Sequence, residues 1–173
     1  MTRRNIFFYY SIFLSICLVL AGLTMVFPVE AANKKREDLI KERCETIKDD
    51  LKNVQREDAK VRVHLGSKYE IILNRFIMPL NVKLVEKNMS NADLVENQNN
   101  FVEAKTTFSN DYIVYQQQLE ELVAMDCKAE PGQFYEKLIK VRQKRKTMEQ
   151  DTMLLRNLIS KHIRLVTRLK EKI

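Results

Sequence analysis

Residues 91–125 read NADLVENQNNFVEAKTTFSNDYIVYQQQLEELVAM. A seven-residue repeat places one stripe of side chains on the same face of an α-helix, which is typical of a helix that packs along its whole length. Here every seventh position is a leucine or an aromatic residue: Leu94, Phe101, Phe108, Tyr115 and Leu122. The companion positions, four residues further on, become apolar only in the second half. We therefore predict a long helix over 91–125 whose first half packs more loosely.

A second helix is predicted over about residues 36–87. Its apolar positions alternate in steps of four and three: Ile40, Cys44, Ile47, Leu51, Val54, Asp58, Val61, Leu65, then Tyr69, Ile72 and Phe76. The two consecutive steps of four around Leu65 form a stutter, which locally unwinds a supercoil. Pro79 is expected to kink or end this helix. A turn near 88–91 follows, with Ser90 and Asp93 resembling a capping box.

The third predicted helix spans about residues 133–172 and follows the helix breakers Pro131 and Gly132. Its seam reads Phe134, Leu138, Val141, Arg145, Met148, Thr152, Leu155, Ile159, His162, Val166, Leu169 and Ile173. Short turns make neighbouring helices antiparallel. With only three Gly, three Pro and no Trp in 173 residues, the chain is predicted to be all-α. We expect residues 34–173 to form an elongated antiparallel three-helix, coiled-coil-like bundle.

The N-terminus predicts export. Arg3 and Arg4 precede an uncharged apolar stretch over residues 6–27, and Val29-Glu30-Ala31 offers a signal-peptidase site after Ala31. Residues 1–31 are therefore either a cleaved signal peptide, which the well-formed cut site favours, or a signal anchor long enough to span a bilayer. Both readings place residues 34–173 outside the cytoplasm, secreted or anchored through the N-terminal helix.

Charge is divided unevenly along the chain. Residues 34–89, 90–132 and 133–173 carry net charges of +4, −6 and +8. Opposite charges on neighbouring helices favour internal pairing along the seams. The third helix keeps a surplus, which predicts a patch able to contact anions such as lipid headgroups or an envelope polymer. The patch comprises Lys140, Arg142, Lys144, Arg145 and Lys146.

The sequence predicts a non-catalytic protein. Its two histidines, His64 and His162, lie far apart in the sequence, and no Cys-x-x-Cys or His-x-x-x-His pair is present. We expect no catalytic residue, cofactor or metal site, and His162 is interpreted as a structural side chain on the seam. No groove-reading motif suggests nucleic-acid binding.

Two cysteines remain once Cys17 is assigned to the export segment, and an exported pair favours the disulfide Cys44–Cys127. A tight turn near residue 89 would instead place Cys44 opposite residue 134, about 10 Å along the helix from Cys127. The mismatch disappears if the first helix ends near Pro79, or if the segment after Met125 leaves the helix and reaches back. Both routes stay open at this point.

Several short motifs are similar to a family of small secreted helical proteins of candidate-phyla-radiation bacteria such as Saccharibacteria. They are Glu42-Arg43-Cys44, Asp111-Tyr112 with Tyr115, Asp126-Cys127, Gly132-Gln133-Phe134 and Leu155-Arg156. The resemblance covers roughly residues 40–173 and implies a signal segment, long helices and a cysteine pair, with no activity to carry over.

The sequence as a whole favours an extracytoplasmic structural or interaction protein, associated with the envelope, whose partner is a protein or an envelope component. Two alternatives are a periplasmic-type holdase chaperone and a membrane-anchored binder of anionic envelope polymers. Residues 6–27 would provide the membrane contact if they are not cleaved, and self-association stays open.

Overall fold

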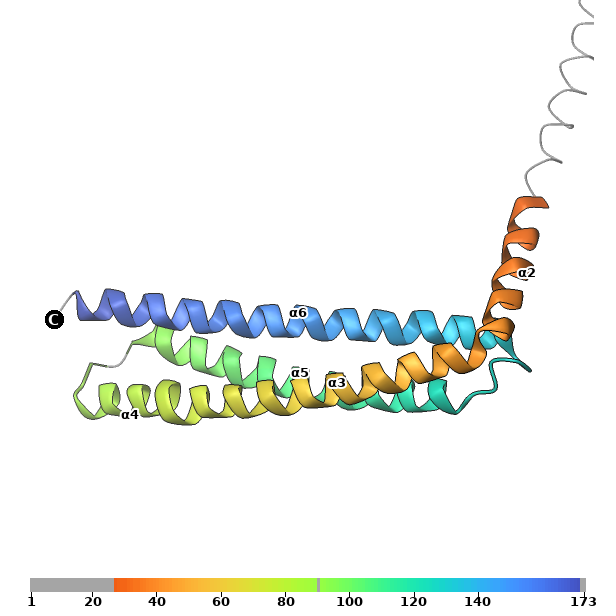
Figure 1. The fold of residues 1–173 in the computed structure, drawn as a ribbon. Helices are drawn as coiled ribbons and strands as arrows, with labels where there is room; N and C mark the ends of the chain where they lie inside the picture. Colours follow the sequence, from red (N-terminus) through yellow and green to blue (C-terminus); the bar gives the residue numbers. More distant parts are fainter. Residues whose placement is uncertain (1–26, 90, 172–173) are drawn as a thin grey trace, which may run out of the picture.

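The computed structural model describes residues 27–89 and 91–171 (Figure 1). These residues are almost entirely helical and contain no strand, which confirms the predicted all-α class. The described elements are α2 (Phe27–Glu42), α3 (Cys44–Ile72), the π-helical turn η1 (Leu73–Ile77), α4 (Met78–Glu86), α5 (Ala92–Ala124) and α6 (Pro131–Lys170).

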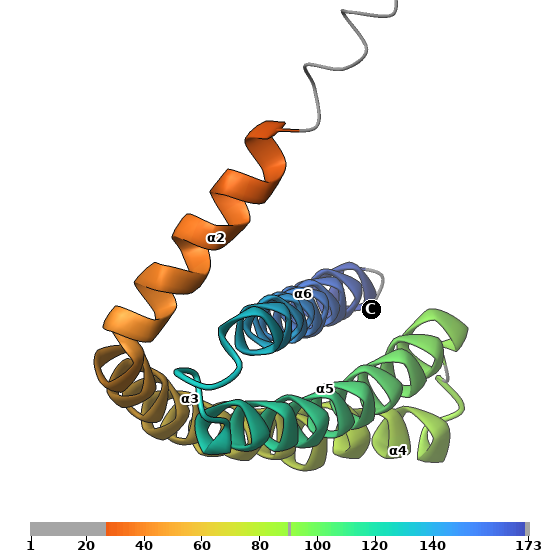
Figure 2. The same cartoon turned by 90° about the vertical axis from the view of Figure 1, so that its right-hand side faces the viewer.

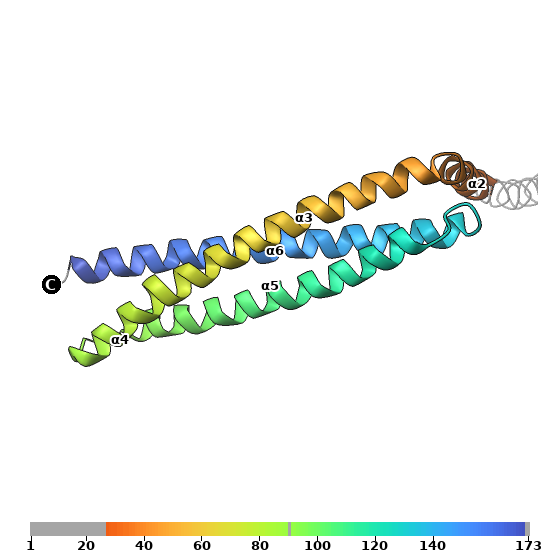
Figure 3. The same ribbon diagram turned by 60° about the horizontal axis from the view of Figure 1, so that its bottom comes forward.

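In the elongated bundle (Figure 3), α5 is the helix that packs against both α3 and α6. All five members of the seven-residue repeat on α5 are buried, with Leu94, Phe101, Tyr115 and Leu122 fully inaccessible to solvent. Figure 2 shows α6 lying over a layer formed by α3–α4 and α5. Helix α5 packs closely against α6 and also against α3, whereas α3 and α4 have no comparable backbone packing with α6. A long seam between α3–α4 and α6 is therefore closed mainly by side chains.

The first predicted helix is divided into four elements. Helix α2 turns into α3 at Arg43 and projects away from the bundle (Figures 1 and 2). Its last two turns pack on the start of α6, where Ile40 is buried and the Arg36 guanidinium lies 4.2 Å from the centre of the Tyr135 ring. The predicted start near residue 36 was therefore wrong, since α2 already includes Phe27, and the break at Arg43 was not predicted.

The predicted irregularity lies more than two helical turns later than expected. Helix α3 stays regular through residues 64–67, and the disturbance is η1, directly before Pro79. The proline lacks an N–H and its ring would clash with the carbonyl of Arg75 in a regular helix. In the π turn Met78 N–H instead donates to Leu73 O, and the helix continues to Glu86 rather than ending.

The π turn also changes which side chains face the core. Four residues of an α-helix rotate by about 400°, so repeated steps of four drift around it, while the wider π turn partly cancels this drift. The buried positions are consequently Tyr69, Leu73, Ile77 and Asn81. Phe76, predicted to lie in the seam, is 62% exposed. Because Phe76 faces away from the core, it borders a surface groove between η1–α4 and α6.

Both helix ends at the α4–α5 turn are capped. The N–H groups of Asn88 and Met89 donate to the carbonyls of Val85 and Leu84, the two bonds of a Schellman motif, and Asn88 takes the positive φ of 52° that this motif requires. Helix α5 begins after Asn91, whose side chain accepts the N–H groups of Asp93 and Leu94. The N-cap residue is thus Asn91 rather than the predicted Ser90.

The Cys44–Cys127 disulfide joins α3 to the segment between α5 and α6, with the two Cα atoms 5.6 Å apart. Helix α4 runs well past Pro79, so the first of the two proposed routes is wrong. The second is confirmed, because α5 ends at Ala124 and the following segment brings Cys127 back to the start of α3. The side chain of Asp126 holds this segment by accepting the N–H groups of Lys128 and Ala129.

The predicted export segment lies outside the described residues except at its end. The first described residue, Phe27, belongs to α2, as does the predicted cleavage position Ala31. Among the described helices, none combines the length and the apolar composition needed to cross a membrane.

Candidate functional site

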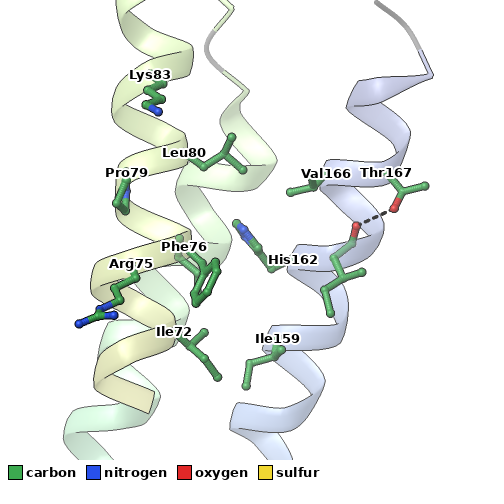
Figure 4. Close-up of a pocket in the computed structure, with 12 residues that line it drawn as sticks. Ile72, Arg75, Phe76, Pro79, Leu80, Lys83, Ile159, His162, Val166 and Thr167 are labelled. Atoms are coloured by element: carbon green, nitrogen blue, oxygen red, sulfur yellow. Dashed lines mark hydrogen bonds between the residues drawn. The ribbon is translucent and has the colours of Figure 1, made fainter. Parts of the chain in front are cut away.

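A groove separates the η1–α4 wall from the C-terminal half of α6, where these segments face each other across the bundle (Figure 4). Its cavity volume is about 580 Å³, within the range of small-ligand sites. Eight of the twelve lining residues are apolar: Ile72, Phe76, Ile77, Pro79, Leu80, Ile159, Ile163 and Val166.

Two large apolar side chains form the lips of the groove. Phe76 on η1 is 62% exposed and Ile163 on α6 is 59% exposed. The partly buried Ile72 and Leu80 line one side of the groove, and the partly buried Ile159 and Val166 line the opposite side, on α6. In the C-terminal half of α6 the core positions are Leu155, Leu158, His162 and Leu165, so the predicted seam residues Ile159 and Val166 border the groove instead.

His162 places one polar ring in this apolar surface. Its side chain extends from α6 towards the η1–α4 wall (Figure 4), and the residue is only 8% exposed. The Nδ1 atom is sealed from solvent without a hydrogen-bond partner, which leaves Nε2 as the ring nitrogen able to face the groove. Burial lowers the pKa of His162, so the ring is neutral at physiological pH.

The charged residues that line the groove are all cationic. Arg75 and Lys83 belong to the η1–α4 wall, and the Arg75 side chain points away from α6 (Figure 4). None of the lining residues in the described part of the chain is acidic. An anionic group at this rim would therefore meet favourable charge on one side and no opposing carboxylate in the lining.

A polar strut crosses the same seam nearer the disulfide. Asp58 on α3 accepts hydrogen bonds from the Tyr115 hydroxyl at 2.6 Å and from Nε and Nη2 of Arg145 at 2.9 and 2.8 Å. The Asp58 side chain is 12% exposed and that of Arg145 is 48% exposed. Burial and the Asp58 carboxylate together raise the pKa of the Tyr115 hydroxyl, so it remains a donor. Cavities of about 280 and 340 Å³ flank this strut.

The structure separates the predicted anion-contact patch into two groups. Arg145 is committed to Asp58, and Lys144 lies 3.7 Å from the Asp111 carboxylate on α5. These two charges are therefore paired between helices. The Lys144–Asp111 pair joins the basic α6 to the acidic α5, as the helix charges predicted, whereas Asp58 lies on α3, in a segment that is itself net basic. The side chains of Lys140, Arg142 and Lys146 are exposed, and none forms an ion pair within the described residues.

Sequence reasoning missed the groove because it assigned Phe76 and Ile159 to the core. The available signal was the succession of four-residue steps from Leu65 through Tyr69, Leu73 and Ile77, which fits a face that includes a π turn just before a proline. Residues 27–89 and 91–171 contain no cluster of three or more metal-ligating side chains.

Comparisons of the chain with protein-family models, curated proteins and solved structures find no match.

Proposed function

We propose that this chain is a non-catalytic, extracytoplasmic interaction protein of the cell envelope, and that the groove between η1–α4 and α6 is its binding surface. The observation that carries the proposal is the apolar groove itself. A hollow bordered by an exposed phenylalanine and an exposed isoleucine is costly to leave in water and is typical of a binding site. The described groove contains one polar ring, His162, and no pair of groups positioned for proton transfer or nucleophilic attack.

Two further features support an exported location. The Cys44–Cys127 disulfide closes a long loop, and such bonds persist in oxidising compartments rather than in the cytosol of most organisms. The apolar stretch over residues 6–27 behind Arg3 and Arg4 fits a signal peptide or anchor. The resemblance to secreted helical proteins of candidate-phyla-radiation bacteria agrees with this location and stays a prediction.

The location is tested by adding protease to spheroplasts of cells that make the full chain. We expect digestion of residues 34–173 without lysis, and loss of the first 31 residues where the signal is cleaved. Protection of the whole domain until lysis would contradict an extracytoplasmic role.

The role of the groove is tested by recovering the tagged full chain from its own envelope and identifying the proteins and lipids that accompany it. The lip variant Phe76→Asp/Ile163→Asp should lose its accompanying components. The matched control, Val63→Asp/Leu154→Asp, changes two side chains of similar exposure, 63% and 50%, outside the groove and should retain them. Equal recovery with both variants would contradict the assignment of the binding surface.

A second candidate, binding of anionic envelope polymers through α6, rests on the exposed Lys140, Arg142 and Lys146. Helix α6 has fewer free cations than its sequence suggested, because Lys144 and Arg145 are matched with carboxylates. Surface cations without a shaped site give weak, salt-sensitive contacts. The groove is therefore the stronger basis for a function.

A further inference from the structure

We propose that the groove between η1–α4 and α6 holds one long-chain fatty-acid anion, with its hydrocarbon chain along the apolar walls and its carboxylate near His162 and the cationic rim. This inference rests on the proposed function and names the occupant of the same site. Three independent properties of the groove support it: its size, its charge and its single buried polar ring.

The size of the groove fits a single acyl chain. A cavity of about 150 Å³ holds benzene, or roughly 25 Å³ per carbon atom. By that measure the groove volume of about 580 Å³ accommodates roughly 20 carbon atoms. A phospholipid with two long chains would exceed it. A three-turn α-helix, about 16 Å long and at least 10 Å wide, occupies roughly 1,200 Å³ and could seat only one face there.

The charge of the rim favours an anion over a neutral or cationic occupant. Arg75 and Lys83 border the groove, and none of its described lining residues is a carboxylate. Both residues are exposed and carry long, flexible side chains whose charged heads can stay near water. A carboxylate at the mouth can therefore be approached by either head without burying an unpaired charge. The same rim opposes a second copy of this chain as occupant, since its own Arg75 and Lys83 would face like charges.

His162 explains why an acid is a better occupant than a plain hydrocarbon. A ring that is 8% exposed, with Nδ1 sealed and unpartnered, leaves Nε2 as its remaining hydrogen-bonding position. Burying Nε2 under a hydrocarbon would leave the whole ring unsatisfied, at a cost typical of lost hydrogen bonds. The carboxylate end of a fatty acid provides that partner, and the remaining methylene groups cover Ile72, Leu80, Ile159 and Val166.

The test uses the full chain in nanodiscs of phosphatidylcholine and a long-chain fatty acid that carries a photoreactive diazirine. After illumination, peptide mass spectrometry locates the adducts. We expect adducts on residues 72–83 and 159–167 that disappear with excess unlabelled fatty acid. The corresponding methyl ester, which lacks the charge, should compete about tenfold less well.

Variants separate groove binding from partition into the bilayer. Phe76→Asp, and independently Ile163→Asp, should reduce groove labelling about tenfold. The matched Val63→Asp, at a position 63% exposed outside the groove, should leave it unchanged. Because all three positions are exposed, these variants are expected to fold, and circular dichroism verifies this. Labelling confined to residues 6–27, or equal competition by acid and ester, would overturn the inference.

The outcomes also separate this inference from the proposed function. If the fatty-acid probe leaves the groove unlabelled while the lip variant still loses a protein partner in the envelope experiment, the occupant is a protein segment and only the fatty-acid inference fails. If the lip variant loses neither lipid nor protein, both proposals fail.

Discussion

The strut formed by Asp58, Tyr115 and Arg145 offers the sharpest test of how the seam between α3 and α6 is held. Removing Arg145 would leave a carboxylate that is 12% exposed with the Tyr115 hydroxyl as its remaining donor. Breaking a fully buried ion pair costs about 3–5 kcal/mol, whereas an exposed pair is worth less than about 1 kcal/mol. Arg145 is 48% exposed, so we expect Arg145→Ala to destabilise the fold by about 2 kcal/mol.

Equilibrium unfolding in urea, with the disulfide intact, measures this change. Arg142→Ala is the matched control, because it removes an arginine from the same helix without breaking an ion pair described in the structure, and it should stay within about 0.5 kcal/mol of the parent. A double-mutant cycle of Asp58→Ala and Arg145→Ala should give a coupling energy of about 1–2 kcal/mol. Equal stability of the Arg142→Ala and Arg145→Ala variants, or a coupling near zero, would refute the strut.

The remaining predictions concern the core, the disulfide and pH. Leu155→Asp puts a charge at a position with no exposure and should unfold the bundle, whereas Leu154→Asp, at a 50% exposed position, should leave the circular dichroism melting curve nearly unchanged. Replacing Cys44 and Cys127 by serine removes a cross-link between residues 83 positions apart and should lower the free energy of unfolding by about 4 kcal/mol; peptide mass spectrometry without reductant should recover the linked peptides from the parent. Because burial lowers the pKa of His162, the unfolded chain binds a proton near pH 6.5 while the fold resists it. The stability from the neutral ring is therefore complete above about pH 6.5 and is lost as pH falls below it; urea unfolding at pH 7.5 and 5.5 should show a smaller decrease for His162→Leu than for the parent.

The centre of the fold could be predicted from the sequence because it depends on a single periodic property. On α5 the seven-residue repeat from Leu94 to Leu122 matches the positions that must face both neighbouring helices, and all of its members are buried. The positions four residues after each repeat member are not apolar in the first half of α5, so weaker packing was predicted there. There the core uses Ala104 and the buried Asn97, whose side-chain amide donates to Leu158 O.

The candidate site could not be predicted in the same way, because it depends on tertiary geometry. Pro79 predicted an irregularity in the helix, but a proline can end, kink or widen a helix. The packing of Tyr69 and Ile77 against the other helices favours the π turn among these outcomes. That choice moves Phe76 from the core to the lip of the groove. Similarly, the run of basic residues on α6 is evident in the sequence, but the sequence alone does not show that Arg145 pairs with Asp58, 87 residues away.

The central claim, that the groove between η1–α4 and α6 is the binding surface, is tested most directly by contact in the intact envelope. A photoreactive amino acid placed at position 76 samples the lip, and the same amino acid at position 63 samples an equally exposed site on α3 outside the groove. We predict that illumination yields a discrete adduct of lipid or protein from position 76 and none from position 63. Equal adducts from both positions, or none from position 76, would contradict the claim.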